Sequence, residues 1–176
     1  TRPVPVDLGD TVNEVLGFMG KEAEYRSIDV VVEIDDDVPE ITTNKGRLQQ
    51  ILLNVINNAF AAVDDGGRIE IGVGRNGSDR VGIRVTDDGC GMTEAQRRRV
   101  FKPFFTTKGS KGTGLGMYIA NHIIAQHGGA IEVDSVYGRG TRVKIRVPRH
   151  RTEAARAIDA LLNSHTDSED GKKDLN

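Results

Sequence analysis

The sequence is poor in several features that mark particular classes of protein. It contains one cysteine, Cys90, so an internal disulfide and a cluster of thiolate metal ligands are excluded. No apolar run approaches the roughly 20 residues of a membrane-spanning helix, and no charged-then-apolar leader opens the chain. The formal net charge of −2 argues against nucleic acid as the main partner, because surfaces that bind nucleic acid need a marked basic excess. We therefore expect a soluble, cytoplasmic domain, for which small anionic ligands remain possible.

The chain does contain enough apolar material for one core. Of its 176 residues 37% are hydrophobic and 28% are charged, and a chain of this length is too short to favour two full domains. We expect one compact domain over residues 1–149. Residues 150–176 are predicted to form a short helix, 152–162, and then a polar tail that we expect to be disordered.

Helical spacing of apolar residues predicts three long helices. Asp10 is the expected N-cap of the first, and Gly128 with Gly129 is expected to end the third. The predicted helices span residues 10–23, 46–63 and 115–126.

Period-two alternation predicts five strands, at 28–34, 69–73, 81–85, 131–135 and 142–147. The Asn76–Gly77 pair between the second and third strands is a strong hairpin signal. Helices separated by hairpins, rather than by single strands, favour a two-layer α/β sandwich with a mixed, largely antiparallel sheet.

Two asparagines of the longest helix, Asn54 and Asn58, share a stripe beside its apolar face. A carboxamide oxygen at the rim of a core is a hard, neutral ligand that suits a magnesium ion already carrying phosphate oxygens and water. An isolated pair of this kind is more often a pair of surface asparagines, so the hypothesis depends on its neighbours.

Asp87 continues the buried face of the strand 81–85, so its carboxylate needs a partner. The exocyclic amine of a purine would serve, because a carboxylate accepts N–H donors, and Gly89 would let the backbone approach a ring closely. The alternative is an ordinary aspartate at the end of a strand, followed by a glycine turn.

A glycine-rich segment, GTGLG at 112–116, directly precedes the third helix. Its backbone amides and the positive end of the helix dipole can face phosphate oxygens. The segment matches neither a GxxxxGK[ST] phosphate loop nor a dinucleotide-binding fingerprint. The alternative is an ordinary connecting loop in which the glycines have no role in binding.

The segment FKPFFTTK at 101–108 lies just before this glycine loop. Its three phenylalanines cannot all be left in water without cost, so we expect them to anchor a lid. Lys108 and Lys111 are the nearest cations for a triphosphate, although a charged loop is usually only a solvated loop.

The order and spacing of these segments resemble the catalytic domain of bacterial sensor histidine kinases. LQQILLNVINNAFAA, DDGCGM, VFKPFFTTK, GTGLGM and GGAIEVDSVYGRGT are similar to the N box, first glycine box, F box, second glycine box and final glycine element of that family. The resemblance covers residues 7–148, and FFTTK followed by GTGLGM is similar to the nitrogen-regulator-type subgroup. It implies the Bergerat-type ATP-binding fold, with ATP and Mg²⁺ as cofactors.

The resemblance also implies a role for individual residues. Asn58 would bind Mg²⁺, Asn54 would position the metal or its water, Asp87 would recognise the adenine amino group, and Thr141 would touch the adenine end. Asn54 and Lys108 are the implied catalytic residues. The remaining implied contacts to the base and the phosphates are Gly89, Gly91, Lys108, Lys111, Gly112, Thr113, Gly114, Leu115 and Gly116. Some family members also carry a basic residue shortly after the second asparagine, where this chain has AFAAVDD; this departure gives the lid lysines more importance.

The resemblance implies that the phosphoryl group is transferred to a histidine on a dimerising helix hairpin. It also implies a response regulator as an indirect partner. No histidine here lies in a context of that kind: His122 is predicted to pack in the core and His127 to sit at a helix end. We expect ATP binding with little autophosphorylation by this fragment alone, and a monomer.

Two relatives with the same nucleotide site are the alternatives. An ATP-hydrolysing relative would need a glutamate four residues before the magnesium asparagine, where this chain has Asn54. An anti-sigma-type serine kinase is the second, and a nucleotide-bound interaction module without transfer is a third possibility.

Overall fold

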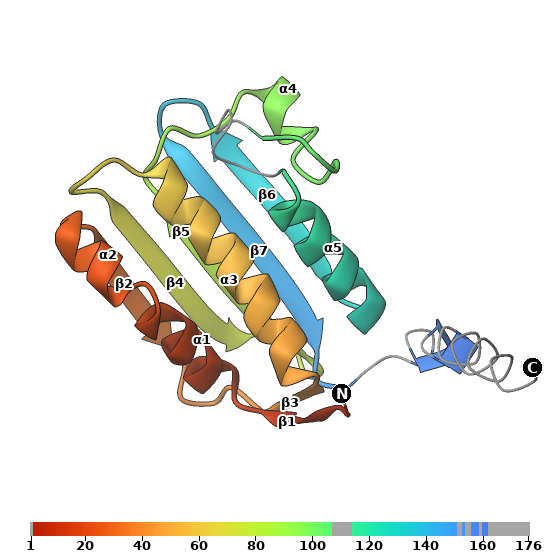
Figure 1. Cartoon of the computed structure of the whole chain (residues 1–176). Coiled ribbons are helices and arrows are strands. Elements are labelled where there is room, and N and C mark those ends of the chain that lie inside the picture. Colours follow the sequence, from red (N-terminus) through yellow and green to blue (C-terminus); the bar gives the residue numbers. More distant parts are fainter. Residues whose placement is uncertain (1, 107–113, 151–152, 154–155, 159, 162–176) are drawn as a thin grey trace, which may run out of the picture.

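The computed structural model describes residues 2–106, 114–150, 153, 156–158, 160 and 161. Its centre is a five-stranded sheet in the order β2-β4-β5-β7-β6 (Figure 1). The β2–β4 pair is parallel and the other three pairs are antiparallel, so the predicted mixed, largely antiparallel sheet is confirmed. The strands are β2 (Asp29–Ile34), β4 (Arg68–Arg75), β5 (Arg80–Asp87), β6 (Ala130–Val136) and β7 (Gly140–Pro148).

Helices form a second layer on one face of this sheet, as the two-layer α/β sandwich requires (Figure 1). Helix α3 crosses the middle of that face, with α5 beside it and α1 on its other side. A small sheet of β1 (Val4–Val6) and β3 (Ile41–Thr43) lies near the start of α3. The helices are α1 (Leu8–Gly17), α2 (Gly20–Tyr25), α3 (Lys45–Ala62), α4 (Glu94–Arg97) and α5 (Gly116–His127).

The core lies between the two layers because each element presents one apolar face to it. In β4 and β5 alternate residues are buried, among them Ile71 and Ile83 at 1% exposure each. The apolar stripe of α3 packs against these strands, and the Asn44 side chain caps the helix by accepting the Arg47 N–H at 3.1 Å. Gly128, at φ +84°, ends α5 in the left-handed conformation that glycine adopts without strain.

The prediction of a single helix over 10–23 is wrong. Two helices occupy this stretch, and the N-cap is Asp7, whose Oδ1 accepts the Asp10 N–H at 2.9 Å. The break falls between Gly17 and Gly20. Glycine is unfavourable in a helix interior, and only proline is more so. The three-residue strands β1 and β3 and the four-residue α4 were not predicted, because such short elements carry no measurable period.

The prediction that His122 packs in the core is also wrong. His122 is exposed and stacks on Tyr118, with ring centroids 6.2 Å apart. The buried histidine is His127, at 8% exposure, whose Nδ1 lies 3.5 Å from the Thr43 hydroxyl. The buried face of α5 is made by Met117, Ala120, Ile124 and His127.

The predicted tail helix, 152–162, is described only in part. Residues 153, 156–158, 160 and 161 are helical, and the prediction for 163–176 lies outside the described residues. Among the described helices, none has the length and apolar content to cross a membrane.

Candidate functional site

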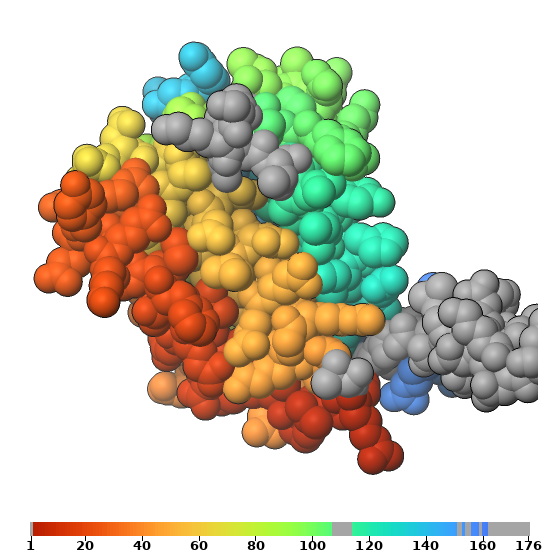
Figure 2. Space-filling view, in the orientation of Figure 1, coloured from red at the N-terminus to blue at the C-terminus, as the bar shows by residue number. Residues whose placement is uncertain are grey.

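A cavity of about 810 Å³ opens between α3, the start of α5 and the ends of β5 and β7. Figure 2 shows α3 and α5 side by side on this face, with the segment of α4 and the residues after it next to α5. The cavity brings together described residues from each of the predicted motifs. The predicted residues that line it are Asn54, Asn58, Asp87, Gly91, Gly114, Gly116 and Thr141.

Asp87 lies at the floor of this cavity. It ends β5 on the buried side of the strand, opposite Ile69 and Thr141 on the two neighbouring strands, and is 8% exposed. Its Oδ1 accepts the Gly89 N–H at 2.9 Å. Burial raises the pKa of this carboxyl from 3.8 to about 6, against the lowering effect of the backbone donors of Gly89 and Thr141. The two backbone donors do not use all the lone pairs of this carboxylate, so Asp87 can still accept a hydrogen bond from a group bound in the cavity that it lines.

The two glycines after Asp87 are required by close backbone contacts. A Cβ at Gly89 would overlap the Ala62 carbonyl at the end of α3, whose oxygen already accepts the Cys90 N–H at 3.1 Å. Gly91, at φ +64°, lies against the Val136 carbonyl. The glycine turn is therefore packed between the end of α3 and the β6–β7 turn, and it shapes one wall of the cavity.

Asn54 and Asn58 lie one helical turn apart on the side of α3 that faces the cavity, and both are half-buried. Asn54 donates its amide N–H to the Gly116 carbonyl at 3.3 Å, which ties α3 to the start of α5. The expected position at the rim of the core is confirmed for both residues.

The glycine loop before α5 is described only from Gly114 onward. Gly114, at φ +70°, packs against the Phe104 backbone, and Leu115 is the N-cap of α5. Gly116 lies against Asn54, where a Cβ would be 3.8 Å from its side chain. The predicted phosphate contacts Lys108, Lys111, Gly112 and Thr113 lie outside the described residues.

The three phenylalanines before this loop do not all anchor it. Phe101 packs partly buried against the core, and the ring of Phe105 lines the cavity with the Arg99 guanidinium 5.0 Å from its centroid. Phe104 is 76% exposed with φ +65°. Phe101 and Phe105 therefore have packing partners, as expected for a set that cannot all be left in water, whereas Phe104 does not supply the expected anchor.

Two residues of the site were missed in the sequence. Ser135 of β6 accepts the Met92 N–H at 2.7 Å, and its hydroxyl lies 2.8 Å from that of Thr141. Ser135 thus links the glycine turn to the strand that carries Thr141. No local pattern marks such a serine, because its partners are contributed by other strands and loops.

Arg26, at the end of α2, is the second missed residue and lines the same cavity. Its guanidinium donates to the carbonyls of Phe60 and Val63, both at 2.7 Å, and to Asp65 at 2.8 Å. These carbonyls are among those that a helix leaves without partners at its C-terminal end. Arg26 therefore fixes the end of α3 that contacts the glycine turn.

The fold and this site define a nucleotide-binding α/β domain, and comparison with known proteins identifies its family. Residues 43–151 match the family described as histidine kinase-, DNA gyrase B-, and HSP90-like ATPase. The sensor histidine kinase ZraS of Escherichia coli O157:H7 is 38% identical over 143 residues, which cover 81% of this chain and 31% of ZraS. The chain thus spans about a third of the length of this relative.

Solved structures agree with this assignment. The nucleotide-free catalytic domain of histidine kinase ThkA has a TM-score of 0.78 and 28% identity, and the match covers 86% of this chain and 98% of that domain. Full-length ShkA, solved in complex with AMPPNP, has a TM-score of 0.75 and 30% identity over 83% of this chain and 31% of ShkA. The chain belongs to the histidine kinase-, DNA gyrase B-, and HSP90-like ATPase family, as an ATP-binding catalytic domain of the sensor histidine kinase type.

Proposed function

We propose that this domain binds Mg-ATP and donates the γ-phosphoryl group to a histidine on the dimerisation helices of the same full-length kinase. The observation that supports it most directly is Asp87, a buried carboxylate at the floor of the cavity with remaining capacity to accept a donor. The adenine amino group supplies such a donor. A response regulator would then take the phosphoryl group from the histidine.

The residues of the cavity fit Mg²⁺ and the phosphates of ATP, the two groups that the reaction needs. The amide oxygens of Asn54 and Asn58 are neutral, hard ligands of the kind that Mg²⁺ accepts together with phosphate oxygens and water. Asn58 would hold the metal, and Asn54 would position it or its water. Phosphoryl transfer asks the protein mainly for positioning and charge neutralisation, which the lid lysines Lys108 and Lys111 would complete.

Titration calorimetry of ATP, with and without Mg²⁺, tests the site directly. Asp87→Asn should lose most of the affinity, because the amide presents an N–H where the base presents one too. Asn58→Ala should lose mainly the Mg²⁺-dependent part. Asp36→Asn and Asn13→Ala remove the same groups at exposed positions outside the cavity lining and serve as matched controls. The assignment of the site is overturned if both site variants bind like wild type.

Transfer is tested separately by mixing the domain with a histidine-bearing hairpin made from the full-length kinase, using ATP labelled on the γ-phosphate. We expect label on the hairpin histidine and little on this chain, as a monomer without such a hairpin. Binding of ATP without label on the hairpin would leave a nucleotide-bound interaction module. Release of free phosphate at a comparable rate would favour an ATPase.

A further inference from the structure

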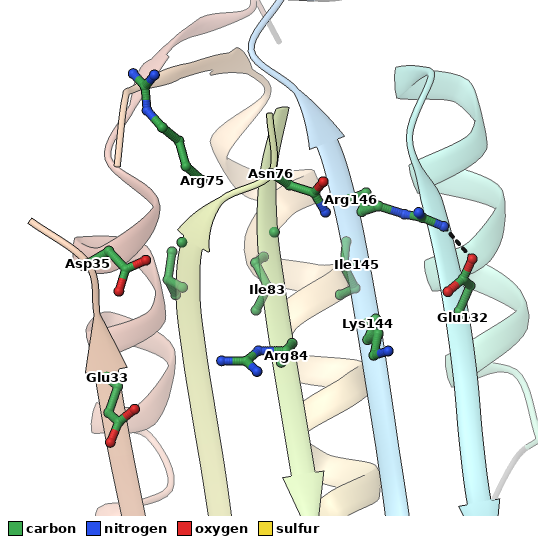
Figure 3. Close-up of a pocket in the computed structure, with 13 residues that line it drawn as sticks. Glu33, Asp35, Arg75, Asn76, Ile83, Arg84, Glu132, Lys144, Ile145 and Arg146 are labelled. Atoms are coloured by element: carbon green, nitrogen blue, oxygen red, sulfur yellow. Dashed lines mark hydrogen bonds and ion pairs between the residues drawn. The ribbon is translucent and has the colours of Figure 1, made fainter. Parts of the chain in front are cut away.

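The sheet face opposite the helices carries a second cavity, a shallow trough of about 350 Å³ (Figure 3). Within the described residues no helix covers this face. Strands β2, β4, β5, β7 and β6 all contribute to it, and the helices lie behind them in Figure 3. This trough is therefore separate from the nucleotide cavity, which lies on the other face.

Glycines form the floor of the trough. Gly74 of β4 and Gly82 of β5 line the trough and are cross-strand partners. Gly72, two residues before Gly74, lies on the same face of β4 and is the cross-strand partner of Arg84. Glycine inside a strand weakens it and marks places where another chain or ligand approaches the backbone closely. Arg84 lies along this floor, since a Cβ at Gly72 would be 3.0 Å from its Nη2.

The two walls of the trough carry opposite charges. Glu33 and Asp35 form the acidic wall at β2, and Lys144 and Arg146 form the basic wall at β7, with Arg84 between them (Figure 3). Both residues of the basic wall also pair with acidic residues of the neighbouring strand β6: Arg146 with Glu132, which lines the trough too, and Lys144 with Asp134 at 3.8 Å. Among the described residues neither Glu33, Asp35 nor Arg84 takes part in an ion pair.

The trough has a definite width. Three strand spacings separate β2 from β7, which is about 14 Å. An occupant that satisfies both walls therefore needs anionic and cationic groups roughly this far apart, joined by a part small enough to lie on the glycine floor.

We propose that the trough binds residues 169–173 of this same chain, Glu-Asp-Gly-Lys-Lys. Glu169 and Asp170 would face Arg84 and the basic wall. Lys172 and Lys173 would face the acidic wall, and Gly171 between the two pairs would cross the floor. Four residue steps of extended chain span about 13 Å, which matches the distance between the walls.

The segment is long enough to reach the trough. β7 leads out of the sheet next to it: Arg146 lines the trough, and the Arg149 N–H is still bound to the Asp79 carbonyl at 2.8 Å. If 152–162 is fully helical it spans about 16 Å, whereas the seven residues 163–169 can span about 23 Å. The acidic pair can therefore return to β7 even when the helix points away.

The proposal does not depend on the proposed function, because the two cavities lie on opposite faces of the sheet. ATP should leave the docked segment in place. Exposed ion pairs are individually weak, so the tether is essential, since it gives a local concentration in the millimolar range. A free peptide of the same sequence should need millimolar concentration to produce the same effect.

The test compares full-length chains by ¹⁵N–¹H NMR at low salt, using the amide signals of Gly72, Gly74 and Gly82. One variant exchanges the tail charges (Glu169→Lys, Asp170→Lys, Lys172→Glu, Lys173→Asp), which leaves net charge and composition unchanged. We expect the three glycine signals to move, and about 1 M salt, with a Debye length of about 3 Å, to move the wild-type signals to the same positions. A matched control exchanges the exposed pair Glu153→Lys and Arg156→Glu and should leave them unmoved.

A second variant addresses the floor. Arg84→Glu, at an exposed position, should abolish the difference between the two tails. The proposal is overturned if the glycine signals are identical in the wild-type and exchanged-tail chains at low salt. It is also overturned if the signals depend on protein concentration rather than on the tail sequence, which would assign the trough to a second copy.

Discussion

The hydroxyl oxygens of Ser135 and Thr141 lie 2.8 Å apart in a row that crosses three strands and ends at Asp87. Ser135 also accepts the Met92 N–H at 2.7 Å and has one proton to donate, either to the Gly140 carbonyl at 3.1 Å or to Thr141. If the proton goes to Thr141, the Thr141 hydroxyl keeps its own proton to donate to a group in the cavity that this residue lines. The serine thus decides whether Thr141 offers a donor or an acceptor to a bound base.

Ser135→Ala should weaken ATP binding by about tenfold, the equivalent of one lost hydrogen bond, although Ser135 is absent from the cavity lining. The measurement is a double-mutant cycle with Thr141→Val by calorimetry. If the serine acts through the threonine, the double variant should lose less than the sum of the two single losses. Ser78→Ala, at an exposed loop position, is the control. Additive losses would contradict the proposed coupling.

Burial of Asp87 should make the stability of the nucleotide-free domain depend on pH in a defined window. The pKa is about 6 in the folded state and 3.8 without the fold, so folding takes up a proton between these values. The contribution of Asp87 protonation to the free energy of unfolding is therefore complete below the lower pKa. It is lost as pH rises through the upper pKa, and the loss amounts to about 3 kcal/mol. Asp87→Asn removes this contribution. The free energy of unfolding of the variant, relative to that of wild type, should therefore increase as pH rises from about 4 to about 7. Urea unfolding at several pH values measures this, and parallel pH curves would contradict the assigned pKa.

The same pKa should appear in nucleotide binding with the opposite preference. The proposed contact to the adenine amino group needs the ionised carboxylate, because the protonated acid loses part of its capacity to accept. With a pKa of about 6, the association constant for adenosine, which lacks the titrating phosphates, should fall about tenfold from pH 7 to pH 5. Asp87→Asn binds more weakly but should lack this pH dependence. An equal pH slope in both proteins would place the titrating group elsewhere.

Much of this architecture is predictable because the long elements repeat one pattern many times. Helix α3 and the hairpin of β4 and β5 present apolar residues at a regular period, and the predicted residues of the site follow directly from the ends of these elements. The N-terminal break is different, because Gly17 and Gly20 stop a helix whose apolar period continues across them.

Other features depend on contacts between distant parts of the chain. Arg26 meets Phe60 and Val63, more than thirty residues away, and Ser135 meets Met92 at a separation of 43 residues. His122 was misplaced because two helical faces of α5 are both apolar, and only packing against α3 and the sheet selects one. Local periodicity contains no information on such pairs.

Arg26→Lys should disturb the nucleotide cavity from a position that sequence motifs do not mark. Lysine keeps the charge but loses the planar fork that reaches Phe60, Val63 and Asp65 together. Hydrogen bonds to charged groups contribute about 1.5–3 kcal/mol each when buried, and the Arg26 side chain is 20% exposed, so we expect a loss of about 2 kcal/mol in the free energy of unfolding.

A positioning role also predicts a local effect that a general loss of stability does not. The Cys90 amide donates to the Ala62 carbonyl at the end of the same helix, so its hydrogen exchange should accelerate more than that of amides in β5 and β7, and ATP affinity should fall with it. Arg98→Lys, at a side chain 73% exposed, is the matched control and should change neither quantity. If Arg26→Lys instead accelerates hydrogen exchange of the Cys90 amide by the same factor as that of the amides in the sheet, the arginine only stabilises the fold and does not shape the site.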